Sequence, residues 1–201
     1  MGLAETQKAL ARLYTDARLR ERFFAAPSEV GRELGLTPED AQQLAALGAR
    51  QADYFAASLV NKRLGEVSKL LPLSARVLGQ EFRKLFRQFA AAEPVPAGLS
   101  KHLRDALAFA EHVGKGGRLA SVAPPWLVEL LCYEKELLRA REAKTRVRVC
   151  LFRYDVRQLA RSVAEDPSRP NLVRRATLAV WLRLGRRGRL RQRLLPLPPW
   201  K

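Results

Sequence analysis

The chain has 201 residues, of which 47% are hydrophobic, and this is enough apolar material to bury a core rather than remain disordered. No apolar run approaches the roughly 20 residues that span a bilayer, and the N-terminus lacks the pattern of a secretory signal, so we expect a cytoplasmic protein that does not enter a membrane. The formal net charge of +17 favours nucleic acid, acidic peptides, acidic protein surfaces or anionic lipid as partners without choosing among them.

Residues 1–143 are predicted to form a helical bundle. Asp16 has the character of an N-cap, and Thr37 is followed by a first-turn proline and acids, so helices are expected to start after both residues. The side chains Phe82, Leu85, Phe86 and Phe89 recur at the i, i+3, i+4, i+7 spacing of one helix face. We interpret this aromatic stripe as core, with a cofactor pocket as the alternative. The last long helix opens at Pro125, and its charged end is expected to emerge from the bundle.

Residues 144–201 change from the helical period to the two-residue period of strands. A strand is predicted over residues 146–151, and a hairpin is predicted from residues 178–184 and 189–194 with a Gly-bounded link between them. Before the hairpin, Asp155 is expected to cap one helix. The fold class that follows is α+β and mainly α: a helical bundle of residues 1–143, then a basic β-rich module of residues 144–201 with a small antiparallel sheet and one helix.

The alternation also predicts which side chains of this sheet are buried. One face would be apolar and would lie beneath the helix that Asp155 caps; its members are Val147, Val149, Leu151, Leu178, Val180, Leu182 and Leu184. The opposite face would carry arginines and Trp181 toward solvent. Residues 144–201 hold 16 Lys and Arg side chains against three acids, so this face would concentrate the positive charge of the chain.

Two devices of this module could bind a partner. An exposed strand edge can accept an extended peptide through backbone hydrogen bonds, and an arginine-covered face can bind carboxylates or phosphates in a bidentate manner. The alternative for any single arginine is a solvated sheet face. The candidate contacts for a peptide or partner, including the three aromatic residues that could stack on bases, are Arg146, Arg148, Phe152, Arg153, Tyr154, Arg174, Arg175, Trp181, Arg183, Arg189, Arg191 and Arg193.

The sequence offers no set of residues typical of catalysis or metal binding. His102 and His112 lie ten residues apart on one predicted helix and point to different faces, so they cannot share a metal ion. Cys132 and Cys150 fit no metal-binding spacing, and we interpret them as buried free thiols. The last long helix also carries an acidic cluster, which we interpret as a solvated face: Glu134, Glu136 and Glu142. We therefore expect no catalytic residue, no metal site and no cofactor, and a chain that is not an enzyme by itself.

Short motifs are scattered through the middle of the chain: Phe55–Leu59, Asn61–Arg63, Leu71–Pro72, Leu78–Phe82, Phe86–Phe89, Pro94, His102–Phe109 and Pro125–Glu134. In these motifs the chain resembles the helical partner proteins that work beside multinuclear non-haem iron oxidases in the maturation of ribosomally made, modified peptides. The resemblance covers roughly residues 50–195. It implies a non-catalytic partner that holds a precursor peptide, by strand addition to the C-terminal sheet, and presents it to an oxidase whose iron ligands lie on another chain.

The N-terminal piece departs from the more familiar members of that family. Its motifs Arg20–Phe23, Pro27, Leu34–Leu36 and Thr37–Asp40 are similar instead to the small helical subunit of ring-opening dioxygenases or to the helical leaders of some modified peptides. This similarity implies a substrate-presenting or docking element. Two other functions stay open: a nucleic-acid-binding protein that uses the basic C-terminal face, and a stand-alone enzyme whose site the motifs do not reveal.

Overall fold

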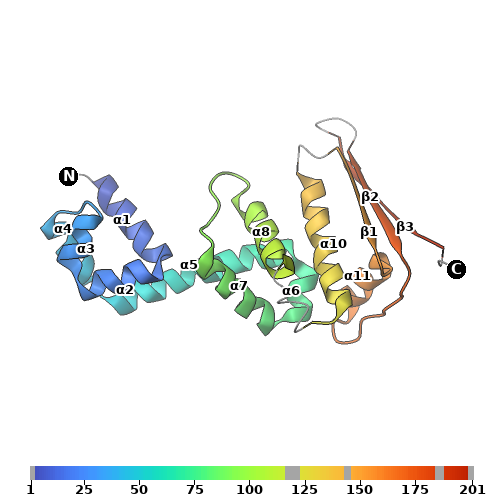
Figure 1. Cartoon of the computed structure of the whole chain (residues 1–201), viewed down its shortest axis with the longest axis horizontal. Helices are drawn as coiled ribbons and strands as arrows, with labels where there is room; N and C mark the ends of the chain where they lie inside the picture. Colours follow the sequence, from blue (N-terminus) through green and yellow to red (C-terminus); the bar gives the residue numbers. More distant parts are fainter. Residues whose placement is uncertain (1–2, 116–122, 143–145, 184–187, 199–201) are drawn as a thin grey trace. The chain divides into compact units, whose positions relative to one another are not determined.

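The computed structural model of this chain describes residues 3–115, 123–142, 146–183 and 188–198. Within these ranges it holds ten helices and one three-stranded antiparallel sheet near the C-terminus, which confirms the predicted α+β, mainly α fold (Figure 1). None of the described helices is both long enough and apolar enough to cross a membrane. Contacts divide the chain into two compact units, Met1–Leu64 with Ala90–Pro94 and Gly65–Phe89 with Val95–Lys201.

The first unit is built from four short helices and the start of a longer one: α1 (Leu3–Thr15), α2 (Ala17–Ala25), α3 (Pro27–Glu33), α4 (Pro38–Ala46) and α5 (Ala49–Leu70). Asp16 accepts a hydrogen bond from Leu19 N at 3.0 Å, and Thr37 Oγ1 accepts one from Asp40 N at 3.1 Å. Both predicted N-caps are confirmed, because each satisfies a first-turn N–H group that has no partner within its own helix. Phe23 is fully buried in the core of this unit.

The second unit contains the helices that follow, except for the end of α7 after Phe89: α6 (Pro72–Leu78), α7 (Gln80–Ala92), α8 (Lys101–Lys115), α10 (Pro125–Arg141) and α11 (Val156–Glu165). The predicted aromatic stripe of α7 is confirmed as core. The ring centroids of Phe82, Phe86 and Phe89 lie 5.1 to 5.5 Å from the centroid of Phe109 on α8. These rings pack edge to face or tilted against one another, which is the geometry that aromatic cores prefer.

The sheet consists of β1 (Val147–Phe152), β2 (Thr177–Arg183) and β3 (Leu190–Pro196), with β2 in the centre. Both strand pairs are antiparallel, and the register places Val149 beside Val180 and Val180 beside Arg193. The predicted strand pairing is therefore confirmed, while most of the predicted Gly-bounded link lies outside the described residues. Within the described part of the chain, β1 and β3 are the two edges of the sheet.

Helix α10 lies along one face of the sheet (Figure 1). Its residues Tyr133 and Ala140 share a buried cluster with Phe152, Ala179 and Trp181 of the strands. The helix after Asp155 is expected from the sequence to cover the Val and Leu face of the sheet, and this is wrong, because those side chains of β1 are exposed. Helix α11 packs mainly against α10 and α6, and it adds Val156 to the buried cluster on the other face of the sheet. The predicted boundary after residue 143 stays a prediction. In the structure, α10 precedes this boundary and the sheet follows it, yet both belong to one compact unit.

Glu134 belongs to the acidic cluster that the sequence predicts to be solvated, and the structure contradicts this prediction. Glu134 is only 5% exposed. Its carboxylate accepts hydrogen bonds from Leu73 N and Ser74 N, both at 2.8 Å, and from Ser74 Oγ at 2.6 Å. Because α6 begins at Pro72, these N–H groups have no partner within their helix. Glu134 thus caps α6 from α10; burial raises the pKa of Glu134, and the hydrogen bonds oppose that rise.

We expect Glu134→Ala to lower the free energy of unfolding by about 3 kcal/mol, because it leaves two backbone N–H groups and the Ser74 hydroxyl without their acceptor. Urea unfolding followed by circular dichroism measures the change. The control is Glu165→Ala, which removes an exposed acid from the last position of α11 and should change the stability by less than about 0.5 kcal/mol. A loss below about 1 kcal/mol in Glu134→Ala would contradict the capping role.

Candidate functional site

The two faces of the C-terminal sheet differ in what covers them. In β1, exposure alternates: Val147, Val149 and Leu151 are exposed, whereas the residues between them are half-buried and Phe152 is buried. In β2 the buried positions alternate from Thr177 to Trp181. We call the face that includes Phe152 and Trp181 the inner face, since it shares the buried cluster with α10, and we call the opposite face the outer face.

The outer face consists of three rows of side chains that run across the strands: Val147–Leu182–Arg191, Val149–Val180–Arg193 and Leu151–Leu178–Leu195. All members of these rows except the two arginines are Val or Leu. The prediction that the apolar alternation is buried is therefore wrong. It lies outward, and on β1 and β2 the residues predicted to face solvent, Arg148, Trp181 and Arg183, lie on the face that packs on α10. On β3, Arg191 and Arg193 are exposed as predicted, but they share the face of the Val and Leu rows. Leu184, which was assigned to the same apolar set, lies outside the described residues.

Trp181 gives the physical reason for this orientation. Its side chain is 0% exposed, and its ring centroid lies 6.2 Å from that of Tyr133 on α10. Tyr133 also contacts Phe152, with ring centroids 6.0 Å apart. Phe152 and Trp181 are large aromatic side chains, so each buries more apolar area than a Val or Leu side chain would. Because the free energy of burial grows with the apolar area removed from water, the face that carries these two residues is the one that packs on α10.

Three of the candidate contacts predicted from the sequence are aromatic, and all three lie in the core. Phe152, Tyr154 and Trp181 are each buried. Phe152 and Trp181 therefore offer no ring face on which a base or a peptide side chain could stack, and Tyr154 is exposed only slightly, where it lines a pocket beside α10. The three aromatic residues therefore do not form one surface with the exposed arginines, although the sequence predicts that they do.

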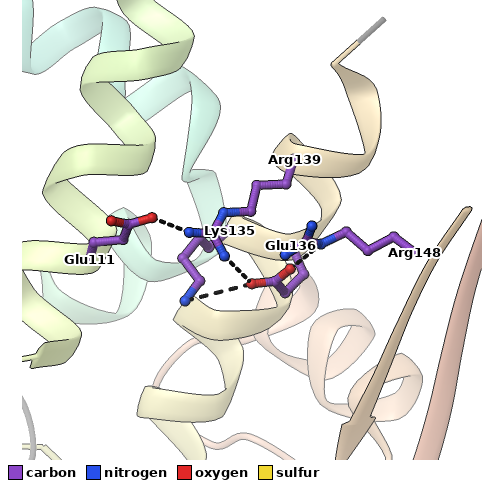
Figure 2. Close-up of polar contacts among 5 residues, drawn as sticks. All are labelled: Glu111, Lys135, Glu136, Arg139 and Arg148. Atoms are coloured by element: carbon purple, nitrogen blue, oxygen red, sulfur yellow. Dashed lines mark hydrogen bonds and ion pairs between the residues drawn. The ribbon is translucent and has the colours of Figure 1, made fainter. Parts of the chain in front are cut away.

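Arg148 lies on the inner face and pairs with Glu136 of α10 (Figure 2). The same carboxylate receives Arg139 Nη1 at 3.0 Å, and Lys135 Nζ lies 3.6 Å from it. Arg139 also pairs with Glu111 on α8. Figure 2 shows Glu136 at the centre of this cluster, which joins α8, α10 and β1. An arginine predicted to contact a partner is thus occupied within the fold.

Glu136 is buried, so the prediction that it belongs to a solvated face is wrong. Burial by itself disfavours the charged form and would raise the pKa of Glu136. The hydrogen bond and the charge of Arg148, together with Arg139 and Lys135, outweigh burial and hold this pKa below its ordinary value. Glu136 therefore stays ionised at neutral pH, and a charge-assisted contact ties the sheet to α10.

Arg183 is a second candidate contact that the fold occupies. Its Nη2 donates a hydrogen bond to Arg141 O at 3.0 Å and lies 3.4 Å from Ala140 O. These carbonyl groups belong to the last turn of α10, where acceptors lack partners within the helix and carry partial negative charge. Arg183 therefore holds the C-terminal end of α10 against β2.

The other candidate arginines are exposed: Arg146, Arg153, Arg174, Arg175, Arg189, Arg191 and Arg193. Arg191 and Arg193 lie on β3, at the ends of two rows of the outer face. Arg175 Nε donates to Leu197 O at 3.3 Å, and this bond leaves most of its guanidinium in solvent. Exposed guanidinium groups can bind carboxylates or phosphates. Their role as partner contacts stays a prediction.

A pocket of about 630 Å³ opens beside the first turns of α10, with Glu129, Arg153 and Arg174 among its lining residues. The Glu129 carboxylate accepts hydrogen bonds from Arg153 N at 2.8 Å and from Tyr154 N at 3.2 Å. The two arginines favour an anionic group in this pocket, while Glu129 opposes one. Among the lining residues that the structure describes, no nucleophile is paired with a base and an orienting group.

Metal-binding and redox side chains are dispersed in the described ranges. No three His, Cys, Asp or Glu side chains there lie close enough together to hold a metal ion. Cys132 and Cys150 are free, and burial raises the pKa of both thiols. A raised pKa keeps a thiol protonated at neutral pH, where it is a weak nucleophile.

The comparisons with known proteins concern the helical middle of the chain. A family model described as SCO6045-like, C-terminal domain, matches residues 45–115. This range overlaps the stretch whose motifs resemble oxidase partner proteins, and it ends before α10 and the sheet. No curated protein matches the chain.

We expect Glu136→Gln to lower the free energy of unfolding at pH 7 by about 2 kcal/mol, since it removes the charge that Arg148 and Arg139 share. The pKa of Glu136 is lower in the folded than in the unfolded state. Its contribution to stability is therefore present above the unfolded pKa and is lost as the pH falls through the folded pKa. The difference between the wild type and the variant in urea unfolding should shrink on acidification.

The control for this experiment is Glu81→Gln, because Glu81 forms a half-exposed pair with Lys84 at 3.6 Å within α7. Such pairs contribute little, so the change should stay below about 0.5 kcal/mol at any pH. Equal losses in the two variants, or a Glu136→Gln difference that is independent of pH, would contradict the assignment of Glu136.

Proposed function

We propose that this chain is a non-catalytic partner protein that binds a precursor peptide and presents it to a multinuclear non-haem iron oxidase during peptide maturation. The observation that carries this proposal is the edge strand β3, which pairs with β2 on one side and carries the exposed Arg191 and Arg193. An extended peptide beside β3 would gain backbone hydrogen bonds, and its carboxylates could pair with these arginines.

The side-chain pattern of β3 indicates which peptides suit this edge. Leu190 and Leu194 turn inward and pack against the buried cluster, while Arg191 and Arg193 turn outward. Side chains of an added strand alternate in the same way. A peptide strand with acidic residues at alternate positions and apolar residues between them would therefore complement β3 on both faces.

The identity of the enzyme partner rests on the family resemblance. The motifs between about residues 50 and 195 resemble helical partners of iron oxidases, and the family match over residues 45–115 falls on the same helical region. In this proposal the oxidase supplies the iron and its ligands, and this chain binds the precursor peptide and orients it.

A second candidate function is nucleic-acid binding, which the uneven charge favours. Residues 144–201 carry 16 basic against three acidic side chains, and Arg174 and Arg175 extend the exposed basic area beyond β3. Such a surface attracts phosphates regardless of sequence. The burial of Phe152, Tyr154 and Trp181 favours the peptide hypothesis instead, since it removes the aromatic residues on which bases could stack.

Co-expression of the full chain with an iron oxidase and a precursor peptide encoded beside it tests the proposal. We expect all three to co-purify at about 0.5 M salt and after nuclease treatment, because specific packing survives the screening of charges. Arg191→Glu with Arg193→Glu should reduce the recovery of the peptide about tenfold, since it turns attraction into repulsion at β3.

The matched control is Arg157→Glu with Arg161→Glu, which makes the same charge change at two exposed positions of α11. This control should leave recovery of the peptide unchanged. Equal effects of the two double variants would contradict binding at β3. Loss of the complex on nuclease treatment would favour the nucleic-acid hypothesis.

A further inference from the structure

The outer face of the sheet exposes more apolar surface than a solvated sheet face requires. Val147, Val149 and Leu151 of β1 are 58%, 54% and 62% exposed, and Leu195 of β3 is also exposed. The Val and Leu side chains of β2 between them are half-buried by their own neighbours. Contiguous apolar patches of this kind mark interaction surfaces in soluble proteins.

Only one of the two faces of the sheet is covered by a helix. Helix α10 lies on the inner face, and Figure 1 shows no described element of the second unit on the outer face. Three strands are roughly 10 Å wide between the outer two, which is close to the diameter of one α-helix. Strands of this length extend about 20 Å, the length of roughly four helical turns. The outer face is therefore large enough to pack against a single helix, as the inner face packs against α10.

The charge along this face is one-sided. Arg191 and Arg193 stand at the β3 end of two rows, whereas the β1 end of each row is apolar. Neither arginine forms an ion pair with the residues that the structure describes. An occupant that places carboxylates along β3 and apolar side chains over β1 and β2 would match both halves of the face.

We propose that the outer face docks an amphipathic helix of a partner protein, whose apolar stripe covers the Val and Leu positions and whose acidic flank pairs with Arg191 and Arg193. This mode is the helix-in-groove type of recognition applied to an open sheet face. It goes beyond peptide addition at the edge of β3, because it uses side chains of all three strands rather than the backbone of one.

Charge and composition favour this occupant over three others. A second copy of the chain would bring another net charge of +17 to the contact. Nucleic acid would cover the apolar rows without offering them apolar contacts. A membrane interface favours exposed Trp and Tyr, and the described outer face carries neither.

Fluorescence anisotropy with the full chain and two labelled, stapled 14-residue helices tests the proposal. Both probes carry Leu along one stripe; the flank beside that stripe carries Glu in one probe and Lys in the other. We expect saturable binding of the Glu probe and at least about tenfold weaker binding of the Lys probe. Arg191→Glu with Arg193→Glu should reverse this preference.

Val149→Asp should weaken binding of the Glu probe at least about tenfold, because it places an unpaired charge in the middle of the apolar rows. Val95→Asp is the matched control: Val95 is 48% exposed, in the loop before α8, and its substitution should leave binding unchanged. Leu151→Gln serves as a second, milder variant. Circular dichroism and the unfolding midpoint check that each variant remains folded.

Four results would overturn the proposal. Absence of saturable binding of the Glu probe would do so, as would binding that Val149→Asp and Leu151→Gln leave unchanged. A dimer in light scattering that Val149→Asp converts to a monomer would assign the face to a second copy. Binding to vesicles of phosphatidylcholine and phosphatidylglycerol, lost in Val149→Asp, would assign it to a membrane. None of these measurements uses an oxidase or a precursor peptide, so they are independent of the proposed function.

Discussion

Burial of Trp181 against Tyr133, joined to the contact between Arg148 and Glu136, decides which face of the C-terminal sheet turns toward α10. Because side chains alternate along a strand, this one choice places every other side chain of the sheet. It draws Arg183 to the end of α10. It also leaves the regular Val and Leu alternation on the outside, where it is free to meet another molecule.

The same choice divides the positive charge into two kinds. Arg148 and Arg183 face the helices and are used for cohesion, since each meets an acceptor on α10. Arg191 and Arg193 face outward from an edge strand and have no such use among the described residues. Fewer arginines are therefore available to a partner than the net charge of the module suggests. The outward arginines lie beside apolar rows, and this combination makes the surface more selective than positive charge alone. A partner that satisfies both features is a protein or peptide with acidic and apolar residues, rather than a bare polyanion.

Features set by local physics could be predicted from the sequence, and features set by distant partners could not. The N-caps at Asp16 and Thr37 and the aromatic stripe of α7 depend on a few neighbouring residues, and all three are confirmed. The cap that Glu134 provides joins residues 60 and 61 positions apart, which no local pattern reveals. Periodicity predicts the wrong buried face of the sheet because it counts apolar positions, whereas folding buries apolar area, and one Trp side chain contributes more area than a Val side chain. A signal was available for one contact: the predicted strand that bears Arg148 follows a helix that carries Glu136, and oppositely charged side chains on neighbouring elements favour an ion pair.

If the C-terminal sheet binds the partner as proposed, the backbone amides of its edge should be protected in the complex. Hydrogen–deuterium exchange of the full chain, alone and in complex with its co-purified partners, measures this protection, because edge-strand amides exchange freely until another strand or chain covers them. We expect slower exchange over β3 (Leu190–Pro196) in the complex and unchanged exchange over α1–α4. Protection confined to α1–α4, with β3 unaffected, would contradict the proposal.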